Sequence, residues 1–195
     1  DMYCVYLGQA LQTVNPPNAS VGLSQLTATG TKNSTTFLRG DNTFAVAGGA
    51  NTPAFMGLLN NSSNGQDIPN ATNTKVNFDT ELFDTDNAFA SNRFTVPSGK
   101  SGSYLFNFGV QPNAWSFGRF IMWLYKNNGL YAYTEMADND NSPANNRSIN
   151  SSTYMQLSDG DYIEMYVYHN NGGTQSIRGA GNEILTYFGG HRLIT

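Results

Sequence analysis

Two runs rich in Asp and Asn are the parts of this 195-residue sequence that come nearest to metal chemistry. Residues 84–87 read Asp-Thr-Asp-Asn and residues 138–141 read Asp-Asn-Asp-Asn, so oxygen ligands fall at alternate positions. Calcium prefers such carboxylate and amide oxygens. Neither run has the central Gly and the terminal Glu of the twelve-residue calcium loop. We therefore expect turns stabilised by Asp and Asn side chains and no cofactor, with calcium as the alternative.

Residue types that carry catalysis are sparse. His169 and His191 are the only histidines and Cys4 is the only cysteine, so we do not expect a zinc site. The sequence has no G-x-S-x-G nucleophile elbow and no Gly loop that would cradle a phosphate. A carboxylate pair for glycoside cleavage stays open, because the fourteen Asp and Glu residues could meet in space. We expect a protein that is not an enzyme, with carbohydrate cleavage as the less favoured alternative.

Two long polar loops are better candidates for ligand binding. Residues 138–147 and 170–182 are rich in Asn and Gly, and each contains an Arg. Amide, hydroxyl and guanidinium groups suit sugar hydroxyls and surface carboxylates. The alternative is that both are solvated loops. The receptor-binding candidates are Asp138, Asp140, Asn145, Arg147, Asn171 and Arg178.

The composition predicts that these loops connect β-strands. Charged residues make up 12% of the chain and aromatic residues 13%, and Asn, Ser, Thr and Gly replace the missing charge. Aromatic residues favour strands, whereas Asn, Ser and Gly disfavour helix interiors. The ten Lys and Arg residues are spread singly, which argues against nucleic-acid binding. No apolar run of about 18 residues is present, so we expect no membrane insertion.

From Pro53 onward, short apolar runs alternate with turns rich in Asn and Gly, which tolerate positive φ angles. Short strands at this spacing indicate an antiparallel β-sandwich or jelly roll. The predicted strands are residues 54–59, 74–78, 93–96, 104–110, 119–125, 130–136, 148–157, 162–169 and 184–193.

Two of these strands have apolar side chains on both faces. In residues 119–125 and 162–169, aliphatic and aromatic residues occupy both sets of alternating positions. A sandwich buries only the inner face of each sheet, so the outer aromatic residues need another cover or are scattered surface residues. Subunit interfaces are rich in Tyr and Trp. The predicted trimer-interface residues are Trp123, Tyr125, Tyr166 and Tyr168.

The N-terminal quarter has a different texture. Residues 1–17 begin with a strand-like alternation and end at Pro16-Pro17, and the start at Asp1 within that strand suggests a fragment of a longer protein. Residues 18–52 are rich in Ser, Thr, Gly and Ala, with few apolar residues. Such a segment cannot build its own core. We expect an extended stalk whose apolar residues are buried against copies of itself or against the next domain.

Residues 53–195 resemble the globular heads of the complement C-one-q and tumour-necrosis-factor-like family. Three segments carry the resemblance: Phe94-Thr95-Val96-Pro97 followed by Gly102, Tyr104 and Phe106; Leu157-Ser158-Asp159-Gly160-Asp161; and Tyr187 to Leu193. The resemblance implies an antiparallel jelly-roll sandwich of about ten strands that forms a homotrimer and binds ligands through loops without catalysis. Some family members hold calcium near the apex, but no such site carries over to this sequence residue by residue.

Residues 21–44, VGLSQLTATGTKNSTTFLRGDNTF, resemble the shafts of bacteriophage tail fibres, and residues 3–17 resemble the end of the attachment domain in podovirus-type fibres. This implies the homotrimeric distal tip of a viral fibre, assembled in the bacterial host cytoplasm and carried on the virion tail. Its partner would be a host surface receptor, a glycan or a protein. The alternatives are a trimerisation clamp with recognition elsewhere, or a carbohydrate-cleaving tailspike. The tripeptide Arg39-Gly40-Asp41 is expected to form a turn and not an integrin ligand.

Overall fold

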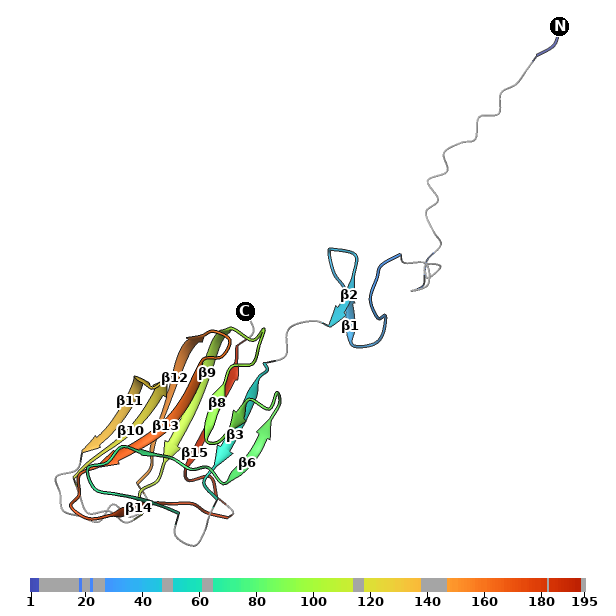
Figure 1. The fold of residues 1–195 in the computed structure, drawn as a ribbon. Coiled ribbons are helices and arrows are strands. Elements are labelled where there is room, and N and C mark those ends of the chain that lie inside the picture. Colours follow the sequence, from blue (N-terminus) through green and yellow to red (C-terminus); the bar gives the residue numbers. More distant parts are fainter. Residues whose placement is uncertain are drawn as a thin grey trace. The chain divides into compact units, whose positions relative to one another are not determined.

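The computed structural model describes the chain in two units, Asp1–Gly48 and Gly49–Thr195 (Figure 1). Every regular element in the described part is a β-strand. The described residues contain no helix with the length and apolar character needed to cross a membrane. The described residues are 1–3, 18, 22, 27–46, 51–60, 65–113, 118–137, 147–181 and 183–193.

A hairpin is the regular structure of the smaller unit. Strands β1 (Thr36–Leu38) and β2 (Phe44–Val46) pair in antiparallel fashion. The predicted turn at Arg39-Gly40-Asp41 is confirmed, because the Arg39 amide donates to the Thr43 carbonyl at 2.7 Å and Asp41 accepts from the Thr43 hydroxyl at 2.6 Å. The two strands that flank this turn were not expected from the sequence. The strand-like segment predicted within residues 1–17 lies largely outside the described residues.

Two antiparallel sheets face each other in the larger unit. We call one the β10–β13 sheet. Its order is β11 (Gly129–Ala137), β10 (Arg119–Lys126), β13 (Tyr162–His169), β8 (Arg93–Thr95) and β7 (Phe89–Ala90), with β5 (Thr74–Lys75) also paired to β13.

We call the other the β9–β15 sheet. Its order is β12 (Ile149–Leu157), β9 (Gly102–Val110), β15 (Tyr187–Arg192), β3 (Ala54–Leu58) and β6 (Thr80–Asp84). Strands β3 and β15, which come first and last along the chain in this sheet, lie side by side, as is typical of a jelly roll. A separate pair joins β4 (Gln66–Ile68) to β14 (Gln175–Ile177).

The jelly-roll prediction is confirmed. All nine predicted strands are present, although several are shorter than predicted, such as the last, which begins at Tyr187 instead of Ile184. In the larger unit, the strands missing from the prediction are β4, β6, β7 and β14, which have two to five residues each. Strands this short contain too few residues for an alternating pattern to be recognised.

Aromatic side chains from the family-like segments meet in the core between the sheets. Phe94 and Phe106 lie 5.6 Å apart between ring centroids, and Phe106 and Phe188 lie 5.8 Å apart. Phe55 stacks on Phe94 at 4.8 Å and meets Phe188 edge-on at 5.0 Å. All four rings are buried. Segments far apart in the sequence are therefore held together by one cluster of offset and edge-to-face ring pairs.

Candidate functional site

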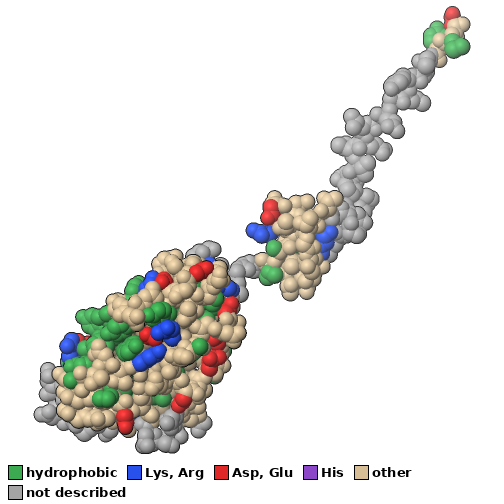
Figure 2. Space-filling model, in the orientation of Figure 1, with side chains coloured by type: hydrophobic (Ala, Val, Ile, Leu, Met, Phe, Trp, Pro, Cys, Tyr) green, Lys and Arg blue, Asp and Glu red, His purple; other side chains and the backbone are tan. Residues whose placement is uncertain are grey.

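The outer surface of the β10–β13 sheet carries half-buried and exposed rings, as the alternation in the sequence predicted. Along β10, Phe120, Met122 and Leu124 enter the core, whereas Trp123 and Tyr125 are half-buried on the other side. We define the aromatic face as Trp123, Tyr125, Tyr133, Tyr166 and Tyr168. Figure 2 shows hydrophobic side chains gathered where β10 and β11 lie in Figure 1.

Trp123 lies at the centre of this aromatic face. Strand register places it opposite Tyr166 on β13 and Tyr133 on β11. Its ring centroid is 5.6 Å from that of Tyr168 and 6.2 Å from that of Tyr125, with planes inclined at 37° and 82°. Tyr133 is 62% exposed. Register between neighbouring strands therefore assembles five rings from three strands into one patch.

An ion network around the buried Glu164 borders the aromatic face. The Glu164 side chain is 3% exposed, and its Oε1 lies 2.7 Å from Lys75 Nζ and 2.9 Å from Arg93 Nη2. Burial raises the pKa of the Glu164 carboxyl, but the hydrogen bonds from Lys75 and Arg93 outweigh burial, so the pKa lies below its usual value. The Arg93 guanidinium also stacks on the Tyr162 ring at 3.9 Å. Two cations on one carboxylate leave this group with one net positive charge.

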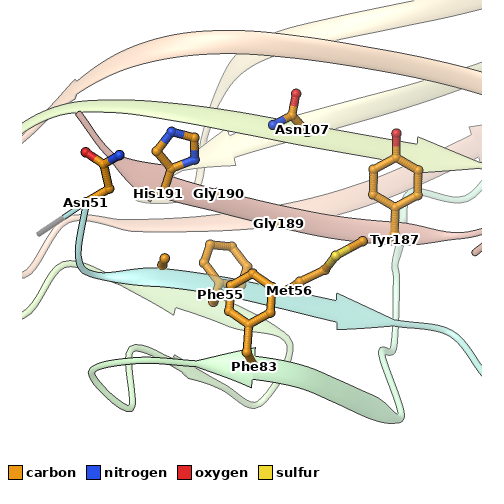
Figure 3. Close-up of a pocket in the computed structure, with 10 residues that line it drawn as sticks. Asn51, Phe55, Met56, Phe83, Asn107, Tyr187, Gly189, Gly190 and His191 are labelled. Atoms are coloured by element: carbon orange, nitrogen blue, oxygen red, sulfur yellow. The ribbon is translucent and has the colours of Figure 1, made fainter. Parts of the chain in front are cut away.

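The β9–β15 sheet has a different outer surface. A hollow of about 390 Å³ opens there, and Figure 3 shows Met56, Tyr187 and His191 around it. Strand register places Gly189 between Met56 on β3 and Asn107 on β9. A Cβ atom at Gly189 would lie 3.4 Å from Met56 Cγ and 3.0 Å from the Phe55 carbonyl oxygen. The missing side chain thus keeps the floor of the hollow open.

Charge is distributed unequally between the two sheets. In the β9–β15 sheet, strands β3, β9, β12 and β15 contain one formally charged residue, Arg192, and the edge strand β6 adds Glu81 and Asp84. The other sheet carries Lys75, Arg93, Arg119, Lys126, Glu135 and Glu164. The hollow was not expected from the sequence. The sequence contained one signal that could have predicted the hollow. It is a set of four strands with almost no charged residues, the last of which contains Gly189 and Gly190.

The loop residues predicted to bind a receptor fall into two groups. Asp138, Asp140 and Asn145 lie outside the described residues, and Arg147 is exposed. Asn171 is half-buried, and its backbone N–H donates to His169 Nδ1 at 3.2 Å. The receptor-binding role of all these residues stays a prediction.

A buried glutamine connects the ends of the two predicted loops. Arg178 Nη1 donates to Gln111 Oε1 at 2.8 Å, and Gln111 Nε2 donates to Ser148 Oγ at 3.0 Å. Gln111 is 6% exposed. The bond to Gln111 gives Arg178 a structural role, whatever else it contacts.

The acidic run at residues 84–87 forms a turn. Asp84 Oδ2 accepts from the Phe89 amide at 2.7 Å, and Asp86 pairs with Lys100 at 3.2 Å. In the part of the chain that the structure describes, no three His, Cys, Asp or Glu side chains lie together as candidate metal ligands. The run at residues 138–141 falls outside that part, and calcium binding there stays a prediction.

No family model matches this sequence, and no curated protein matches it. Solved structures do. The globular domain of zebrafish complement 1qA protein is 21% identical, with a TM-score of 0.51, and the match covers 72% of this chain and 96% of that chain. Murine APRIL at pH 8.0 is 11% identical, with a TM-score of 0.52, covering 72% of this chain and 98% of that chain. The larger unit is therefore a jelly roll of the complement C-one-q and tumour-necrosis-factor-like type.

Proposed function

We propose that this chain is a homotrimeric binding module, the distal tip of a bacteriophage tail fibre that attaches the virion to a glycan on the host-cell surface. The observation that carries the proposal is the fold, because C-one-q-like and tumour-necrosis-factor-like domains are in general trimeric receptor-binding modules. The aromatic face and its ion network supply an exposed surface with the chemistry for binding.

Self-association has two candidate surfaces. The first is the aromatic face, as predicted from the sequence. The second is the hollow around Gly189, on the β9–β15 sheet, whose strands β3, β9, β12 and β15 carry one charged residue, while its edge strand β6 carries Glu81 and Asp84. Charged residues are depleted from the cores of subunit interfaces, since burying an imperfectly paired charge is costly. Charge distribution therefore favours the hollow, with Met56 and Tyr187 as the contact residues.

The smaller unit supports the fibre setting. Phe37 and Val46 in the hairpin are 60% and 67% exposed, although both are apolar. Copies of the same hairpin in a trimeric shaft would cover them, as the shaft-like sequence of residues 21–44 implies. Assembly in the bacterial cytoplasm and location on the virion tail follow from the same resemblance.

A trimerisation clamp is the second candidate function. The hollow favours it, because self-association through the β9–β15 sheet requires no external ligand. In that case another part of the fibre would recognise the host.

Light scattering of the full chain at micromolar concentration, followed by binding to an immobilised glycan array, tests both functions. The attachment proposal expects three times the chain mass of 21.3 kDa and binding to at least one glycan class. A trimer that binds no glycan indicates the clamp. A stable monomer contradicts both.

A further inference from the structure

We propose that the aromatic face and the Lys75–Glu164–Arg93 network together form a binding site for an acidic saccharide, a sugar chain whose rings carry carboxylate groups. The inference rests on the proposed function, since it names the site and the ligand class for glycan attachment. It places the ligand on the β10–β13 sheet and not on the two polar loops.

The rings have the arrangement that a sugar needs. Tyr125 and Tyr166 lie 4.8 Å apart with planes inclined at 57°, and Trp123 is inclined to both of its ring neighbours. The rings are therefore not closed into one parallel stack, and parts of them stay open to solvent. The C–H groups on one side of a pyranose carry partial positive charge, which is attracted to the negative face of an aromatic ring.

Polar groups lie along the edge of these rings. The Tyr166 hydroxyl is 3.5 Å from Glu164 Oε2, and Asn73 Nδ2 is 3.5 Å from the Tyr125 hydroxyl. Hydroxyl and amide groups at the border of an apolar platform fix the orientation of a ligand by hydrogen bonds to its hydroxyls.

The ion network specifies the charge of the ligand. The whole chain has a formal net charge of −4, yet the Lys75–Glu164–Arg93 group carries one net positive charge beside the rings. The side chains of Lys75 and Arg93 are 26% and 41% exposed. Buried Glu164 holds both cations in place, so their exposed edges are preorganised for a carboxylate.

A second subunit fits this surface less well. Closing a dry interface over it would remove water from Lys75, Arg93 and the Arg119–Glu135 pair across β10 and β11. The desolvation of such charges often exceeds the attraction gained. A saccharide leaves the border of the site hydrated and avoids most of that penalty.

The test uses the full chain on an array of uronic-acid and sialic-acid oligosaccharides, each paired with its carboxyl methyl ester. The esters keep the ring and remove the charge. We expect binding to the free acids and at least about tenfold weaker binding to the esters. Equal binding to both members of each pair would overturn the assignment of an acidic ligand, while leaving glycan attachment intact. Binding to no member of this array would also overturn the acidic ligand, whereas glycan attachment itself is overturned only if the general glycan array shows no binding as well.

Three variants locate the site. Trp123→Ala and Lys75→Gln should each weaken binding to the free acids about tenfold or more. The matched control is Tyr154→Ala, which truncates an exposed tyrosine of β12 in the other sheet and should bind as the unaltered chain does. Full binding by Trp123→Ala would place the ligand elsewhere and overturn the inference alone. Loss of the oligomer in Trp123→Ala would identify the aromatic face as a subunit interface and also overturn it.

A measurement without truncation complements these variants. The chain has two tryptophans, so Trp115→Phe leaves Trp123 as the one fluorescent indole. A free acid that stacks on Trp123 should shift or quench the emission of this indole. The emission change should saturate over the same range of ligand concentration as binding does on the array. Unchanged emission at saturation contradicts the stacking.

Discussion

Lys75 Nζ lies 2.7 Å from Glu164 Oε1, and 89 residues separate the two along the chain. The bond joins the two-residue strand β5 to the long strand β13, where Lys75 is also the register partner of Tyr166. One contact thus fixes a short strand and places a cation beside the aromatic face.

Glu164→Gln should destabilise the larger unit by about 3 kcal/mol, because it leaves Lys75 and Arg93 close together without their carboxylate. Urea unfolding followed by circular dichroism measures the free energy of unfolding. The control is Glu135→Gln, which removes the carboxylate of the more exposed pair with Arg119 and should have a smaller effect. Equal losses in both variants would show that burial of Glu164 is unimportant.

Acid should destabilise the fold through Asp161. Hydrogen bonds from Lys126, the Ser158 amide and Asn127 lower the pKa of its carboxyl to about 2. A carboxyl whose pKa is lower in the folded state stabilises the protein above its unfolded pKa and loses that effect as pH falls toward the folded pKa. The free energy of unfolding should therefore decrease between about pH 5 and about pH 2, by about 2 kcal/mol from this group.

Urea unfolding at several pH values checks this contribution. Asp161→Asn should flatten the decrease at acid pH, whereas Asp67→Asn, at an exposed position of β4, should leave it in place. The same decrease in Asp161→Asn as in the unaltered chain would assign the acid sensitivity to other carboxyls.

Met56→Asp should dissociate the oligomer, because it places a charge in the hollow around Gly189. Light scattering measures the mass of each variant. Trp123→Asp serves as the matched change on the opposite sheet and should leave the oligomer intact. If Trp123→Asp dissociates the oligomer and Met56→Asp does not, the result supports the interface predicted from the sequence. In that case Trp123→Ala should also weaken trimers, by about 2 kcal/mol.

Arg178→Ala should lower the free energy of unfolding by about 1 kcal/mol, because it removes the hydrogen bond to the buried amide of Gln111. Arg147→Ala, at an exposed position, should have less effect on stability. Thermal unfolding and the glycan array are measured on both variants. If Arg178→Ala instead keeps full stability and loses glycan binding, the predicted loop at residues 170–182 becomes the better candidate for the receptor site.

Much of the fold could be predicted from local patterns. Alternation in residues 119–125 predicted both the buried Phe120 and Met122 and the outward Trp123, and all of these are as predicted. The hairpin β1–β2 was missed because strands of three residues are too short to show a distinctive period. Four rings of the candidate site were named from the sequence, but as trimer-interface residues and not as a ligand site, and that assignment stays a prediction. Tyr133 and the ion network were not named.

The sequence by itself determined where the longer strands lie, which of their side chains enter the core, and that the surface would be poor in charge. These properties depend on a two-residue period and on composition, both of which are local. Only the tertiary structure decided that Lys75 and Arg93 meet Glu164, and that Gly189 lies between Met56 and Asn107. Those contacts depend on the order and register of strands that are far apart in the chain, and no local pattern encodes that order.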